Sequence, residues 1–140
     1  MAAAGSAPGY SGKPLAAKLG IGDGATALVL NAPADYAAWL APLPPGARIV
    51  TRPAAGLRFV HLFVNERVKL AAALAIYRES LPADGVLWVS WPKKASKVPT
   101  DITEDTIREL ALPLGWVDVK VCAVSEVWSG LKLVVRKALR

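Results

Sequence analysis

The sequence predicts an α/β protein whose core is a mostly parallel, three-layer sheet that ends in an antiparallel hairpin. Short apolar runs, typical of strands covered on both faces, alternate with helical segments over most of the chain. Such alternation favours a parallel sheet with helices on each face. The last two strand-like segments are joined by a link too short for a crossover, so they are expected to pair antiparallel.

The composition suits a single folded domain. The chain has 140 residues and 54% of them are hydrophobic, which is ample for one core. We expect residues 1–12 to form a flexible tail and residues 13–140 to form one domain. No uncharged apolar run reaches the ~18 residues of a membrane span. The first residues also lack the basic start and apolar centre of a signal peptide. The sequence therefore predicts a cytoplasmic location and no membrane partner.

Prolines and glycines mark the elements of the first half. A helix is expected between Pro14 and Gly20, because proline is favoured at a helix start and glycine just past a helix end. A second, short helix is expected between Pro33 and Pro42. Three strands are expected here, each an apolar run bounded by turns: 25–32, 47–52 and 57–65.

The second half contains the clearest helix, over residues 66–81. Its apolar side chains recur at helical spacing and predict a buried stripe of Leu70, Leu74, Tyr77 and Leu81. A buried strand over 86–91 follows, and then a helix capped by Thr103 or Asp101. The closing strands are expected over 116–124 and 131–137. In the first of these, alternation predicts one shared face for Val117, Val119, Val121 and Ala123.

The order of these elements over residues 13–137 resembles class I S-adenosylmethionine-dependent methyltransferases. That family has a lead-in helix before its first strand and an antiparallel hairpin after its last helix. The resemblance implies a Rossmann/methyltransferase-like fold, truncated by one strand–helix unit. Four stretches resemble, more specifically, a small bacterial family of unknown function, which implies no activity: YSGKPLAAKLGI (10–21), LNAPADY (30–36), WVSWPKK (88–94) and WSGLKLV (128–134).

The cofactor motif of the methyltransferase family is degenerate in this chain. The family has an acidic residue and three spaced glycines after its first strand, where Asn31, Ala32 and Pro33 stand here. Pro33 has no backbone N–H to donate. The family's acidic residue after the second strand, which binds ribose hydroxyls, is replaced by Arg52, which can only donate hydrogen bonds. We therefore predict no cofactor.

Ligands of open α/β sheets bind beyond the carboxyl ends of the parallel strands. Asn65 is expected at this edge, as are Ser125 and Glu126 if the first closing strand is parallel to the others. The candidate ligand-binding residues are Asn31, Asp35, Tyr36, Arg52, Trp91, Lys93, Lys94, Lys97, Trp128 and Ser129.

The segment after the fourth strand is the most suggestive of these. It carries three lysines and no acidic residue before Asp101, so it is suited to a phosphate or carboxylate. Trp91 could stack a ring beside them. The alternative is a solvated basic loop next to a tryptophan that covers the core. Similarly, Trp128 either lies exposed at the hairpin tip or folds back onto the sheet.

The remaining reactive side chains are interpreted as structural rather than catalytic. His61 lies within an apolar strand and is expected to be a hydrogen-bonded core residue rather than a base. Cys122 is expected to be buried or half-buried in its strand. Since the chain has one cysteine and one histidine, we predict no metal site.

These observations favour a non-catalytic protein that binds an anionic small molecule or partner at the carboxyl edge. One alternative is a diverged methyltransferase that uses Asn31 and Asp35 in place of the missing loop. Another is a basic nucleic-acid-binding module, which the net charge of +6 allows. A third is a homo-oligomer that self-associates through the outer hairpin.

Overall fold

The structure is a computed structural model, and it describes residues 13–140. The tail predicted over residues 1–12 lies outside the described residues. The described strands form one six-stranded sheet. They are β2 (Thr26–Leu30), β3 (Arg48–Val50), β4 (Phe59–Phe63), β5 (Val86–Pro92), β6 (Trp116–Ala123) and β7 (Trp128–Val135).

The sheet has the order β3-β2-β4-β5-β7-β6. Strands β3, β2, β4 and β5 are parallel, while β7 is antiparallel to both β5 and β6. Strand β6 therefore runs in the same direction as β5, so the turn from β6 to β7 lies at the carboxyl edge of the parallel strands. The mostly parallel sheet with a closing antiparallel hairpin is confirmed.

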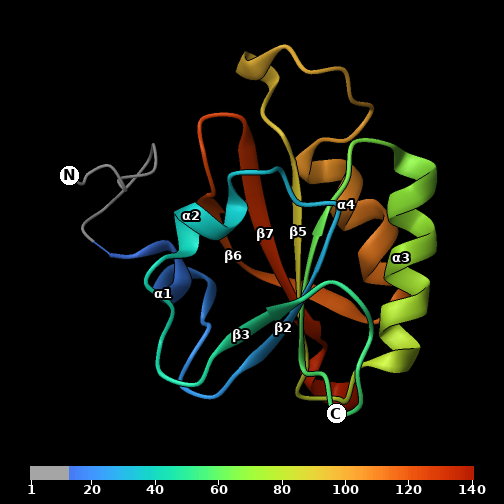
Figure 1. The fold of residues 1–140 in the computed structure, drawn as a ribbon. Helices are drawn as coiled ribbons and strands as arrows, with labels where there is room; N and C mark the ends of the chain where they lie inside the picture. The colour runs from blue at the N-terminus through green and yellow to red at the C-terminus, as the bar shows by residue number, and fades with distance from the viewer. Residues whose placement is uncertain (1–12) are drawn as a thin grey trace.

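Helices cover both faces of this sheet, which gives the predicted three layers (Figure 1). One face carries α1 (Leu15–Leu19) and α2 (Tyr36–Leu40), and the other carries α3 (Arg67–Ser80) and α4 (Glu104–Ala111). Short 3-10 turns complete the secondary structure at Lys94–Ser96, Leu112–Leu114 and Lys137–Leu139.

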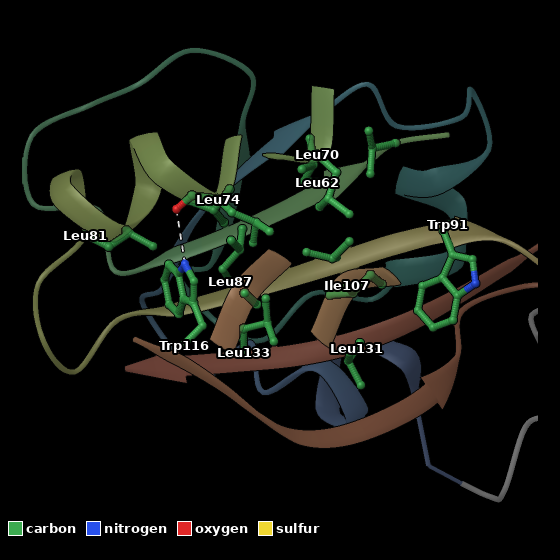
Figure 2. Packing of buried hydrophobic residues seen from close by; sticks show 14 of the residues in the cluster. Leu62, Leu70, Leu74, Leu81, Leu87, Trp91, Ile107, Trp116, Leu131 and Leu133 are labelled. Atoms are coloured by element: carbon green, nitrogen blue, oxygen red, sulfur yellow. Dashed lines mark hydrogen bonds between the residues drawn. The ribbon is translucent and has the colours of Figure 1, made fainter. Parts of the chain in front are cut away.

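The core on the α3 and α4 face contains the predicted stripe of the long helix. Leu70 and Leu74 are fully buried there against alternate residues of β4, β5 and β7 (Figure 2). The indole nitrogen of Trp116, at the start of β6, donates to the carbonyl of Leu74 at 3.1 Å. This bond satisfies the polar atom of a buried indole and ties the outer hairpin to α3.

The core on the α1 and α2 face also contains a buried tryptophan whose indole nitrogen donates to a helix carbonyl. The indole nitrogen of Trp88 on β5 donates to the carbonyl of Leu19 at 2.8 Å, which satisfies a carbonyl in the last turn of α1. Gly20 follows in the left-handed conformation, with φ of 84°. The helix end predicted from this glycine is confirmed.

The two candidate caps serve different helices. Thr103 caps α4, since its side-chain oxygen accepts from the backbone N–H of Thr106. Asp101 instead accepts from the backbone N–H of Arg67 at 2.6 Å, at the start of α3. A residue that precedes one helix in sequence thus caps another helix in space.

The shared face predicted for alternate residues of β6 is wrong. A bulge between Asp118 and Lys120 shifts the register by one residue. Val117 therefore pairs with Val134 on the α1 face, whereas Val121 pairs with Leu131 on the α4 face. Val119 and Val121 are exposed on β6, which is an edge strand of the sheet. Self-association of the chain through this hairpin stays a prediction.

None of the helices within residues 13–140 has the length and apolar character needed to cross a lipid bilayer.

Candidate functional site

A crevice opens at the carboxyl ends of β2 and β4, which lie side by side in the sheet. The connection after β2 passes through α2 on one face, whereas the connection after β4 passes through α3 on the other. Two connections that leave neighbouring strands toward opposite faces create the point where α/β sheets bind their ligands.

A pocket of about 210 Å³ occupies this crevice. Its walls combine amide, aromatic, apolar and basic side chains from three strand ends and one helix. They are Asn31, Phe63, Val64, Asn65, Lys69 and Trp128. A second pocket of about 450 Å³ lies beside it, under the loop that follows β2, and shares Asn31 as a wall.

Asn31 takes the place where a glycine would be least strained. Its φ is 60°, a left-handed conformation that asparagine tolerates better than most residues other than glycine. The residue is exposed, and its amide group can both donate and accept hydrogen bonds.

Trp128 lies half-buried at the crevice, which decides between its two predicted positions. Its ring and that of Phe63 form a T-shaped pair with centroids 5.1 Å apart and planes at 82°. The indole thus folds back onto the sheet and still contributes to the pocket wall.

Lys69 is a wall residue that the sequence analysis did not identify. Its ammonium pairs with Glu66 at 3.0 Å, and both side chains are more than half exposed, so the pair is weak and easily exchanged for another anion. One sequence feature could have identified Lys69: it lies in the first turn of a helix that starts just after Asn65. That helix start has to lie at the carboxyl edge.

Asn65 joins the crevice to the segment before α4. Its backbone carbonyl accepts from the Thr100 hydroxyl at 2.8 Å, and its side-chain nitrogen donates to the Pro99 carbonyl at 3.5 Å. These bonds fix residues 99–101 against the start of α3.

Two predicted ligand-binding residues point into the core, and these predictions are corrected. Trp91 is 7% exposed and packs with the α3 and α4 cluster (Figure 2). Strand alternation directs it to that face, so it is not available to stack a ligand. Tyr36 is 3% exposed, because the first turn of α2 directs it inward.

The other predicted residues lie at the carboxyl edge but outside the crevice pocket. Arg52 and Asp35 are exposed on the loops after β3 and before α2. Ser129 pairs with Trp91 within the sheet. The lysines lie in the segment after β5, which extends beyond the sheet (Figure 1). Within residues 13–140, no ion pair involves Lys93, Lys94 or Lys97.

His61 is a hydrogen-bonded core histidine, as predicted. Its Nδ1 lies 2.7 Å from the Tyr36 hydroxyl and its Nε2 lies 2.7 Å from the Ser90 hydroxyl. Burial lowers the pKa of His61 to about 3 and raises that of Tyr36. Both groups are therefore uncharged at neutral pH.

Other chemical features of the described residues lie outside the crevice pocket. A larger pocket of about 700 Å³ lies between the Pro53–Arg58 loop and the second half of α3, and contains none of the predicted ligand-binding residues. Cys122 is half-buried on β6, and burial raises its pKa. Residues 13–140 contain no group of three or more His, Cys, Asp or Glu side chains placed to hold a metal.

Comparison with solved structures shows a methyltransferase-like fold. The chain is similar to the fibrillarin pre-rRNA processing protein of Methanococcus jannaschii, with 10% identity over 90% of this chain and 70% of that one and a TM-score of 0.54. It is also similar to a Sulfolobus solfataricus protein described as a type 11 methyltransferase, with 10% identity, coverage of 79% and 85%, and a TM-score of 0.51.

A third similar structure is LepI in complex with S-adenosylmethionine, with 15% identity over 80% of this chain and a TM-score of 0.50. The chain spans 36% of the length of LepI. No protein-family model matches the sequence, and no curated protein matches it either. These likenesses show the Rossmann-like methyltransferase fold. Membership of the small bacterial family stays a prediction.

Proposed function

We propose that this chain is a non-catalytic α/β protein that binds a small anionic ligand in the crevice between Asn31 and Asn65. One observation carries the proposal. The pocket at this point of the sheet brings an amide, a tryptophan ring and an ammonium group together. Small-molecule sites typically combine such an apolar wall with a few convergent polar groups.

Each wall suggests a part of the ligand. The exposed portion of Trp128 suits a flat ring, and Lys69 suits a phosphate or carboxylate that displaces Glu66. Asn31 offers hydrogen bonds to either part. Since the pocket is about 210 Å³, it has room for one ring-sized group, and a longer ligand would extend under the loop after β2. A nucleoside monophosphate has this chemistry.

S-adenosylmethionine, which the fold family implies, does not fit these residues. It carries a sulfonium cation, which favours a nearby carboxylate, whereas a nucleoside monophosphate carries an anionic phosphate. Neither of the two adjoining pockets has an Asp or Glu in its walls. The loop that would approach the cofactor contains Ala32 and Pro33 in place of glycines. We therefore propose no methyl transfer.

Nucleic-acid binding through the segment after β5 is the second candidate. Its support is a projecting segment with three lysines, none of which forms an ion pair with another residue of the described part of the chain. The burial of Trp91 removes the ring expected to stack a base. The lysines alone would give binding that weakens steeply with salt.

Titration calorimetry with adenosine monophosphate tests the proposal, with S-adenosylmethionine and a single-stranded oligonucleotide as comparisons. We expect the monophosphate to bind and Lys69→Ala to weaken it about tenfold, as for the loss of one charged hydrogen bond. Lys137→Ala, which changes an exposed lysine in neither adjoining pocket, is the matched control.

No binding at millimolar monophosphate would refute the proposal. Tighter binding of S-adenosylmethionine would favour the methyltransferase alternative. Binding of the oligonucleotide alone, lost on Lys93→Ala/Lys94→Ala, would favour the nucleic-acid alternative.

A further inference from the structure

A chain of buried polar groups connects α2 to the middle of the sheet. Tyr36 is the first residue of α2, and its hydroxyl bonds to His61 on β4 at 2.7 Å. His61 bonds in turn to Ser90 on β5 at 2.7 Å. Tyr36 is 3% exposed and the other two are fully buried.

This network leaves no ring nitrogen of His61 without a partner. A neutral imidazole has one donor and one acceptor nitrogen, and a hydroxyl can serve as either partner. Because burial keeps the imidazole neutral, two hydroxyls satisfy it. A satisfied network in the buried interior fixes the relative positions of its members.

Tyr36 and Leu40 are the two buried side chains that anchor α2, while Ala32 and Trp39 pack partly against the same cluster. The helix spans Tyr36–Leu40, has no side-chain cap bond at Asp35, and buries only Tyr36 and Leu40. A helix of this length has little stability of its own. The backbone N–H of Tyr36 donates to the Pro33 carbonyl at 3.0 Å. The position of Tyr36 therefore sets the position of the loop that begins at Asn31.

The same side chains also contact the opposite wall of the crevice. Phe63 stacks on His61 with centroids 4.4 Å apart and meets the Tyr36 ring at 5.2 Å. The Phe63 ring also meets the Trp128 ring, with centroids 5.1 Å apart. Phe63 and Trp128 are both walls of the crevice pocket.

We propose that Tyr36 and His61 are positioning residues that hold both walls of the crevice, the loop of Asn31 directly and Trp128 through Phe63. Their effect on ligand binding rests on the proposed function. Their effect on the loop stands without any ligand.

Amide hydrogen exchange measured by NMR tests the positioning of the loop. Tyr36→Phe keeps the ring contacts and removes the hydrogen bond on the loop side of His61. Ser90→Ala is the matched control, because it removes the bond on the β5 side and leaves Tyr36 bonded. After correction for global stability, we expect exchange at the Tyr36 and Trp39 amides to be about tenfold faster in Tyr36→Phe and unchanged in Ser90→Ala. Equal exchange in the two variants would overturn the proposal.

His61→Gln is the second variant if Tyr36→Phe does not fold. The same faster exchange at the Tyr36 and Trp39 amides is expected of it.

Binding of adenosine monophosphate to the same variants separates this proposal from the preceding one. We expect Tyr36→Phe to weaken binding about tenfold and Ser90→Ala to leave it unchanged. If the wild type does not bind the monophosphate, the proposed function fails, while the exchange rates still decide the positioning role. If Tyr36→Phe exchanges faster but binds as well as the wild type, the proposed control of the crevice is wrong.

Discussion

Acidification from neutral pH is expected to destabilise this protein through His61. Burial lowers the pKa of His61 from 6.5 to about 3 in the folded chain. The unfolded chain takes up a proton below about pH 6.5, whereas the folded chain does not. Stability from the neutral imidazole is therefore complete above that pH and is lost as the pH falls toward 3.

The size of the effect follows from this difference in proton binding. Each pH unit below 6.5 costs about 1.4 kcal/mol until the folded-state pKa of about 3 is reached. Between about pH 7.5 and about pH 5, the free energy of unfolding should fall by about 2 kcal/mol. That is a large share of the roughly 5–15 kcal/mol typical of a single domain.

Urea denaturation at the two pH values measures this loss. His61 is the only histidine in the chain, so comparison with a variant that lacks it isolates its contribution. His61→Gln, which does not titrate, should have a flat profile, while Ser90→Ala should keep the wild-type slope. A wild-type difference below about 0.5 kcal/mol with an unchanged m-value would refute the reasoning, because it would mean that the folded chain protonates His61 as readily as the unfolded chain does.

Three further predictions concern the elements that support the crevice. Leu74→Ala should cost about 3 kcal/mol in urea denaturation, because Leu74 is fully buried. Ile76→Ala on the exposed side of the same helix should change stability by less than about 0.5 kcal/mol, and equal losses would contradict the assignment of the helix faces. Thr103→Ala should cost about 1 kcal/mol, since it removes the side-chain cap of α4; an unchanged denaturation midpoint would show that the cap is dispensable. Asn31→Gly should be close to neutral in thermal denaturation, whereas Asn31→Val should cost about 1 kcal/mol or more, because φ is 60° there. The same melting temperature for both variants would contradict the left-handed conformation.

Local sequence features were sufficient for most of the secondary structure. Pro14 and Gly20 bracket the first helix because the constraints on proline and glycine act within a few residues. The alternation of apolar runs and helices likewise predicted parallel strands, and with them a shared carboxyl edge for Asn31 and Trp128. The first inference succeeds because proline and glycine act on the backbone near them. The second succeeds because strands connected through helices pair in parallel.

Long-range contacts decided which side chains reach the crevice. Trp91 and Tyr36 lie at the predicted edge, but their backbone positions direct them into the core. Lys69 resembled any surface lysine until the start of α3 was placed beside Asn31 and Trp128. The bulge in β6 moved Val121 to the opposite face from Val117, although alternation placed them together.

The sequence by itself determined the order along the chain and the type of the elements of this protein. The pairing of β7 with β5 and β6 decided the direction of β6 and the order of the strands in the sheet. The tertiary structure decided the inward or outward orientation of each edge residue and the pairing of Tyr36, His61 and Ser90. The physical reason is that helix ends and strand periods depend on neighbours along the chain, whereas burial and buried hydrogen bonds depend on partners that only folding brings together.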